Sequence, residues 1–180
     1  NEAGLENPNA WIQTRHSAEE IRTPSSSNRA VSYPYTKMMN ANMVVDMGAA
    51  LILCSVEKAK QLGIEEGKWV YPYAGVQGYD HFSASVRDNF VESPGVRITG
   101  RRVMDLACTT AEELEYVDLY SCFPSAVQVA AKELGLSEDR PLTVTGGLTF
   151  GGGPLNNYVM HSVARTVELL RANPGKKGLV

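Results

Sequence analysis

The stretch that decides the fold is Val144-Thr145-Gly146-Gly147-Leu148-Thr149-Phe150-Gly151-Gly152-Gly153-Pro154. Its five glycines let the backbone pass close to a ligand or to another segment of the chain. Pro154 suits the first turn of a helix, whose free N–H groups would then face the loop. The stretch lacks both the Lys-Ser/Thr ending of a Walker loop and the spacing of a GxGxxG loop. By spacing alone, a close packing turn is therefore favoured over a nucleotide site.

Alternating apolar patterns on both sides of this loop predict an α/β fold. We expect strands at 51–54, 69–74, 117–120 and 142–144, and helices at 56–62, 96–108, 123–134 and 155–170. The last of these helices carries one apolar stripe, formed by Leu155, Val159, Val163, Thr166 or Val167, and Leu170. Strands that alternate with helices predict a layered sheet covered by helices.

The chain divides into a polar arm, residues 1–42, and the α/β part, residues 43–180. The arm has little periodicity, and a surface linker and a loop that covers a site are equally compatible with it. The chain opens in polar coil without an initiator Met, and it stops at 178–180, where an apolar strand begins. We therefore expect a fragment of a longer chain.

Composition excludes several classes of protein. The chain has 180 residues, 16 Gly, 9 Pro and a net charge of −3, which is typical of one globular domain and not of a disordered chain. Its basic residues are scattered and no apolar run has membrane-spanning length, so neither nucleic-acid binding nor a membrane span is predicted. Cys54, Cys108 and Cys122 are odd in number and lack CxxC spacing. The sequence therefore predicts neither a zinc site nor a disulfide framework, and it predicts a cytoplasmic location.

Four segments in the same order resemble the thiolase superfamily, nearest to its branch associated with sterol-carrier proteins. Asp46–Leu53 is similar to the Asp-Gly-Ala-Ala strand that ends the thiolase N-terminal half, and Ser55–Ile64 to the SxEKAxxLG helix after it. Val117–Phe123 resembles the Asn-Glu-Ala-Phe or His-Asp-Cys-Phe motif, and Thr145–Leu155 the NxGGxxxxGHPxG loop. The resemblance implies the C-terminal half of a thiolase-like layered fold. Its mixed sheet, covered by helices, would be one half of a pseudo-symmetric αβαβα sandwich.

The same comparison shows where the chain departs from the family. The catalytic His of the GHP motif falls on Gly153, which cannot take a proton from a thiol or polarise a thioester carbonyl. The Asn or His of the strand-end motif falls on Tyr120, the acidic residue after it on Ser121, and the Gly after HPL on Asn156. The resemblance implies that the nucleophilic Cys lies in the N-terminal half, outside this chain, and that the second family Cys lies beyond Val180.

Two side chains are candidates for catalysis. Tyr120 follows a predicted strand and could donate to a developing oxyanion or enolate, although a Tyr that only anchors its loop is slightly favoured. His161 lies two helical turns after Gly153, on a face with Asn157, Arg165 and Glu168, and a solvated face is the competing interpretation. Substrate contacts are expected from the loop and the start of the last helix, at Gly147, Gly152, Gly153, Asn156 and Tyr158. No metal ligands are predicted.

The resemblance implies an acyl-CoA acyltransferase, similar to an acetyl-CoA acetyltransferase of lipid metabolism, which transfers groups other than aminoacyl groups. Coenzyme A would be substrate or product, with no tightly bound cofactor. One alternative is a thiolase-like aldolase that cleaves a hydroxyacyl-CoA through Tyr120 or Tyr158, and another is a non-catalytic acyl-CoA-binding or assembly protein. The implied partners are the missing N-terminal half, a second copy in a homo-oligomer such as a dimer, and a small accessory domain or subunit.

Overall fold

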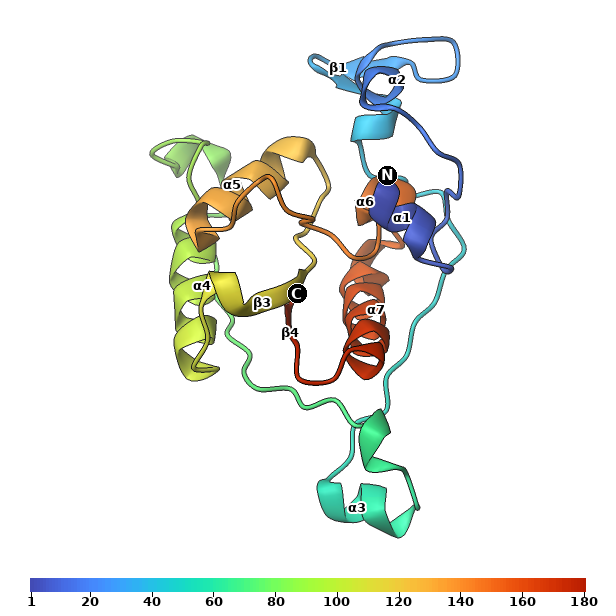
Figure 1. Ribbon diagram of the computed structural model, residues 1–180. Coiled ribbons are helices and arrows are strands. Elements are labelled where there is room, and N and C mark those ends of the chain that lie inside the picture. The colour runs from blue at the N-terminus through green and yellow to red at the C-terminus, as the bar shows by residue number, and fades with distance from the viewer.

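The computed structural model describes residues 1–180 as an open arrangement of short elements (Figure 1). Its helices are α1 (Glu2–Glu6), α2 (Ala18–Arg22), α3 (Val56–Gln61), α4 (Pro94–Leu106), α5 (Pro124–Leu134), α6 (Gly147–Phe150) and α7 (Tyr158–Ala172). Its strands are β1 (Ala30–Ser32), β2 (Tyr35–Thr36), β3 (Leu114–Val117) and β4 (Lys177–Leu179). Single 3₁₀ turns lie at Lys37–Met39, Glu66–Lys68, Ala84–Val86, Ala111–Glu113 and Leu155–Asn157. Only 27 of the 180 residues are buried, so much of the chain has no neighbour on one side.

The centre of the fold is a parallel pair of strands covered by helices. In β3 and β4, Leu114 pairs with Lys177 and Val117 with Leu179. The predicted strand at the end of the chain is confirmed, and the one predicted at 117–120 lies at 114–117. The buried apolar core lies between these strands and α4 and α5, and it consists of Leu114, Val117, Leu119, Ala131, Leu134 and Leu136.

Helix boundaries follow the local capping signals. Ser55 accepts a hydrogen bond from the Lys58 N–H at 3.2 Å and starts α3 where it was predicted. Gly135, at φ +70°, ends α5 in the left-handed conformation that glycine tolerates best. The predictions of α4, α5 and α7 are confirmed to within three residues, because each helix combines a start or stop signal with an apolar periodicity.

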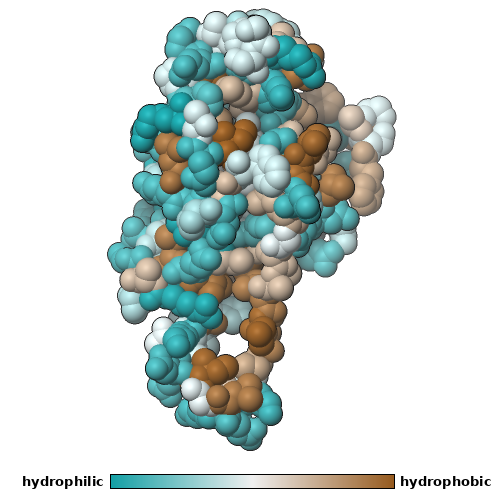
Figure 2. Space-filling view, turned by 90° about the vertical axis from the view of Figure 1, so that its right-hand side faces the viewer, coloured by the Kyte–Doolittle hydropathy of each residue, from teal (hydrophilic) through white to brown (hydrophobic).

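Three predicted strands are wrong. Residues 51–54, 69–74 and 142–144 are not strands, and Ile52 and Leu53 are 93% and 77% exposed, not buried. Between Met43 and Cys54 no backbone group forms a hydrogen bond within the backbone, although burial alternates along Val45–Leu51 as in a strand. A strand needs a neighbour to bond with, and this chain supplies none here. Figure 2 shows apolar side chains gathered on the lower part of the molecule, around α3.

The most buried face of α7 is polar. Tyr158, Ser162 and Thr166 are buried, whereas Leu155 and Val159 of the predicted apolar stripe are 68% and 50% exposed. The stripe therefore lies partly on the open side of the molecule. The α-helix also begins at Tyr158 and not at Leu155, because a 3₁₀ turn precedes it.

The arm forms small elements that pack on the glycine-rich loop. In Figure 1, α1 lies against α6, while α2 and the antiparallel pair β1–β2 stand above them. Asn28 holds the upper part together: it is 1% exposed, donates to the Glu20 and Ile21 carbonyls, and accepts from Met38 N–H. The boundary at residue 42 stays a prediction. None of the helices has the length and apolar character needed to cross a membrane.

Candidate functional site

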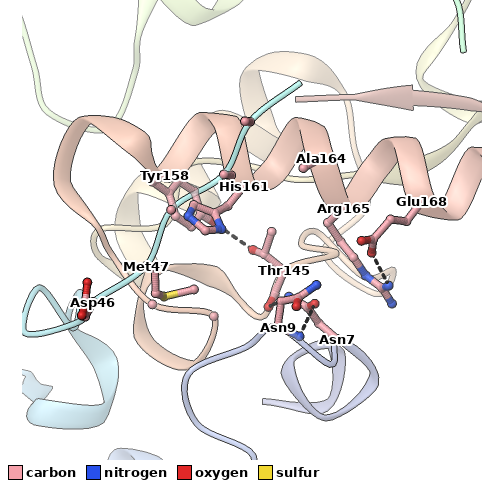
Figure 3. A pocket seen from close by; sticks show the side chains of 15 residues that line it. Asn7, Asn9, Asp46, Met47, Thr145, Tyr158, His161, Ala164, Arg165 and Glu168 are labelled. Carbon is pink, nitrogen blue, oxygen red and sulfur yellow. Dashed lines mark hydrogen bonds and ion pairs between the residues drawn. The ribbon is translucent and has the colours of Figure 1, made fainter. Parts of the chain in front are cut away.

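A cavity of about 410 Å³ lies beside the glycine-rich loop and the start of α7 (Figure 3). Four segments line it: the arm, the unpaired stretch 46–50, the loop and α7. The side chains that Figure 3 labels around it are Asn7, Asn9, Asp46, Met47, Thr145, Tyr158, His161, Ala164, Arg165 and Glu168. Gly151 and Gly152 complete the wall on the loop side.

The arm covers the loop through backbone hydrogen bonds. Trp11 N–H donates to the Gly151 carbonyl at 3.1 Å, and Gly153 N–H donates to the Asn42 carbonyl at 2.9 Å. Gly152 has a φ of +104°, and a Cβ there would lie 2.5 Å from Met47 Sδ. This close approach requires glycine. The arm therefore packs directly on the loop through its backbone.

Most N–H groups of the loop already have partners inside the chain. Gly147 N–H donates to Thr143 Oγ1 at 2.9 Å, Leu148 N–H to Ser121 Oγ at 3.0 Å, and Gly151 N–H to the Gly147 carbonyl at 2.8 Å. Gly152 lies in no helix or strand, and its N–H donates no hydrogen bond to the backbone. Gly152 is also one of the residues that line the cavity.

Two polar groups of α7 lack partners at the cavity. His161 Nε2 and Arg165 Nε are buried atoms without a hydrogen bond. The other nitrogens of Arg165 are held, because Nη1 pairs with Glu168 Oε2 at 3.0 Å and Nη2 donates to the Glu6 carbonyl at 2.9 Å. Burial lowers the pKa of the His161 imidazole below its usual 6.5. His161 is therefore neutral near pH 7 and able to accept a proton.

Tyr158 is locked in place behind the cavity. It is 2% exposed, its OH donates to Asp118 Oδ2 at 3.0 Å, and it lies 2.9 Å from Thr145 Oγ1. Burial and the neighbouring Asp118 carboxylate raise the pKa of the Tyr158 phenol. The phenol is therefore held in its neutral form.

The remaining predicted site residues lie outside the cavity lining. Tyr120 is 51% exposed, and its ring meets the Tyr158 ring edge-on at 5.6 Å. Asn156 is exposed, whereas Gly147 and Gly153 are buried. The structure thus brings together Gly152, Tyr158 and His161 of the predicted set, and no group of three or more His, Cys, Asp or Glu side chains is placed to hold a metal ion.

Sequence reasoning missed Asp118, which joins β3, the loop and α7. Its carboxylate is 3% exposed and accepts hydrogen bonds from both the loop and the helix. The available signal was an acidic residue between the apolar residues Val117 and Leu119, since a buried carboxylate needs several donors. Asn7 was also missed, because it lies in no recognisable motif, and Thr145 was not singled out although it begins the segment that resembles the family loop.

Known proteins resemble this chain at low identity. Acetyl-CoA acetyltransferase 1 of Arabidopsis thaliana is 29% identical over 140 residues, which are 78% of this chain and 31% of that protein. An acetyl-CoA acetyltransferase of Methanothermobacter thermautotrophicus is 22% identical, over 95% of this chain and 47% of that protein. No family model matches the chain.

A solved structure decides the fold. The crystal structure of a monomeric SCP2-thiolase-like protein type 1 from Mycobacterium smegmatis superposes with a TM-score of 0.84 at 32% identity, over 99% of this chain and 40% of that one. This chain has a thiolase-like fold. The predicted recognition and fold class are confirmed, including the correspondence to a C-terminal half. The thiolase-like chain spans about a third of the length of the plant enzyme.

Proposed function

We propose that this thiolase-like chain is part of an acyltransferase that acts on acyl-CoA thioesters, with the nucleophilic Cys outside these 180 residues. The observation that carries the proposal is the cavity beside the glycine-rich loop. His161 lines this cavity, and its buried Nε2 forms no hydrogen bond. The similarity to acetyl-CoA acetyltransferases supports the substrate class.

His161 is the proton acceptor in this proposal. The family His falls on Gly153, which has no side chain to accept a proton. His161 is neutral near pH 7 and lines the same cavity, so it can take the proton of a thiol brought in by the rest of the protein. Gly152 N–H would donate to the thioester carbonyl oxygen, where negative charge develops during acyl transfer.

The other predicted site residues have supporting roles in the proposal. Tyr158 closes the back of the cavity, and the buried Gly147 and Gly153 allow the loop to pack closely enough to form its wall. Asn156 is exposed and free to contact the outer part of a substrate. Coenzyme A is a substrate or product, and no tightly bound cofactor is required.

A thiolase-like aldolase acting on a hydroxyacyl-CoA is the second candidate. Gly153 favours it, because carbon–carbon cleavage by acid–base chemistry needs neither the family His nor a nucleophilic Cys. Tyr120 would then supply the proton, since its phenol is half exposed whereas that of Tyr158 is held by Asp118. A non-catalytic acyl-CoA-binding protein is the third candidate.

The partners and the compartment belong to the same proposal. The expected N-terminal half is consistent with relatives and a solved structure of which this chain covers 31–47%. A cytoplasmic location fits the three free cysteines, because thiols stay reduced there. The role in lipid metabolism is part of the same proposal. The dimer and the accessory domain stay predictions, and the M. smegmatis protein is described as monomeric.

The test is thiolysis of a 3-ketoacyl-CoA by coenzyme A with the full-length protein, together with calorimetric titration of an acyl-CoA. Loss of turnover in His161→Gln, with turnover kept in Tyr120→Phe, would support the acyltransferase. His81→Gln is the matched control, because His81 is exposed and outside the cavity.

Cleavage of a hydroxyacyl-CoA that is lost in Tyr120→Phe, without thiolysis, would instead identify the aldolase. Acyl-CoA binding without either reaction would leave the binding protein. Absence of acyl-CoA binding would overturn all three candidates.

A further inference from the structure

Asp118 is a buried carboxylate without a cationic partner. It is 3% exposed and takes part in none of the ion pairs of the chain. Its charge is instead compensated by neutral donors, six of which lie within hydrogen-bonding distance. A buried charge is costly unless such donors surround it, so these groups are held in a fixed geometry around it.

The two oxygens of Asp118 bind different parts of the site. Oδ1 accepts from Thr143 Oγ1 at 2.6 Å, from Val144 N–H at 2.8 Å, and from the N–H and Oγ1 of Thr145 at 3.1 and 3.0 Å. These contacts fix the entry to the glycine-rich loop. Oδ2 accepts from Tyr158 OH at 3.0 Å and from Ser162 Oγ, and these contacts fix α7.

The contacts to α7 determine how that helix is rotated about its axis. Tyr158 and Ser162 are four residues apart and therefore lie on one face of the helix. Two anchors on one face allow little rotation. At roughly 100° per residue, His161 points about 60° away from Tyr158, on the side of the cavity, and Arg165 follows one turn later. A rotation of α7 would carry His161 out of the cavity or into the loop.

We infer that Asp118 is a positioning residue, which sets the rotation of α7 and the place of the loop so that His161 and Gly152 border one cavity. The inference rests on the proposed function for its catalytic meaning, since it names what holds the proposed proton acceptor. The geometric part is independent of any reaction, because it concerns only where His161 lies in the folded protein.

The environment of His161 provides a direct readout. The charged groups that line the same cavity are Arg165 and Glu168 on α7 and Asp46 on the unpaired stretch. Burial keeps the pKa of His161 low. If α7 rotates or loosens, water reaches the imidazole and its pKa rises toward the 6.5 of an unburied histidine. A loss of global stability alone would leave the pKa in the folded population unchanged.

The experiment is an NMR titration of His161 in the full-length protein with labelled histidine, in the absence of substrate. Asp118→Asn keeps the shape of the side chain but places an N–H₂ group where one acceptor oxygen was, so we expect the pKa of His161 to rise. The double variant Tyr158→Phe with Ser162→Ala removes only the helix contacts, and the same rise is expected. Asp105→Asn, an exposed position on α4, is the matched control and should leave the pKa unchanged.

An unchanged His161 pKa in either folded variant would overturn the inference. If Asp118→Asn does not fold, the double variant decides. An inactive protein whose His161 pKa still depends on Asp118 would refute the proposed function and retain the inference. An active protein whose His161 pKa does not change in the Asp118 variant would refute the inference and retain the proposed function.

Discussion

Replacement of Gly152 by Ala tests how tightly the arm and the unpaired stretch pack on the loop. Gly152 has a φ of +104°, a conformation that costs a residue with a Cβ about 1–3 kcal/mol. The new Cβ would also lie 2.5 Å from Met47 Sδ and 3.3 Å from Trp11 Cβ. Overpacking of this kind costs about 1–3 kcal/mol, and less where a flexible Met can move. We expect Gly152→Ala to lower the free energy of unfolding by about 2–5 kcal/mol.

Gly175→Ala separates the two contributions. Gly175 has a similar φ of +85°, but nothing lies within 4 Å of the position of its Cβ. Only the conformational cost of about 1–3 kcal/mol is therefore expected there. The assay is urea denaturation of the full-length protein followed by circular dichroism, with the free energy taken by linear extrapolation. A Gly152→Ala variant no less stable than Gly175→Ala would refute the close packing of Met47 and Trp11 on the loop.

Three further predictions concern other parts of the chain. Asp118→Ala should lower the free energy of unfolding by about 1–3 kcal/mol in urea denaturation, because the Val144 N–H loses its partner, whereas the Thr145 N–H also reaches Thr143 Oγ1 at 3.2 Å. Asp118→Asn should cost less than half of that, and equal losses would contradict this expectation. Folding lowers the pKa of His161, so its contribution to the free energy of unfolding should be fully present above pH 6.5 and be lost as the pH falls through the folded-state pKa. His161→Gln should abolish this part of the pH dependence of the urea midpoint. Backbone amides of Met43–Cys54 should be protected from hydrogen exchange in the full-length protein, where a strand from outside this chain can pair with them; exchange at the rate of an unfolded peptide would contradict that pairing.

Features that depend on neighbouring residues were predictable from the sequence. Ser55 and Gly135 mark helix ends because a cap acts within one turn, and the apolar spacing around Val127 located α5. The glycine-rich loop was located correctly because its composition alone permits the positive φ at Gly152 and the close approach of the arm. The resemblance to thiolases rests on motifs of this local kind.

Features that depend on distant partners were not predictable. The apolar run at 51–54 has the composition of a strand, yet nothing in this chain bonds to it. The run at 142–144 is diverted by Asp118, whose carboxylate takes the N–H of Val144. In the candidate site, the helix face predicted to carry His161 is the one that lines the cavity. Asp118 was missed because its donors come from two segments distant in sequence, residues 143–145 and α7.

The stretch Met43–Cys54 has a consequence for the life of the protein after synthesis. Proteases bind their substrates in extended form through free backbone N–H and C=O groups, and this stretch presents such groups with no competing hydrogen bonds within the backbone. A protease of low specificity should therefore cut this chain first within Met43–Cys54.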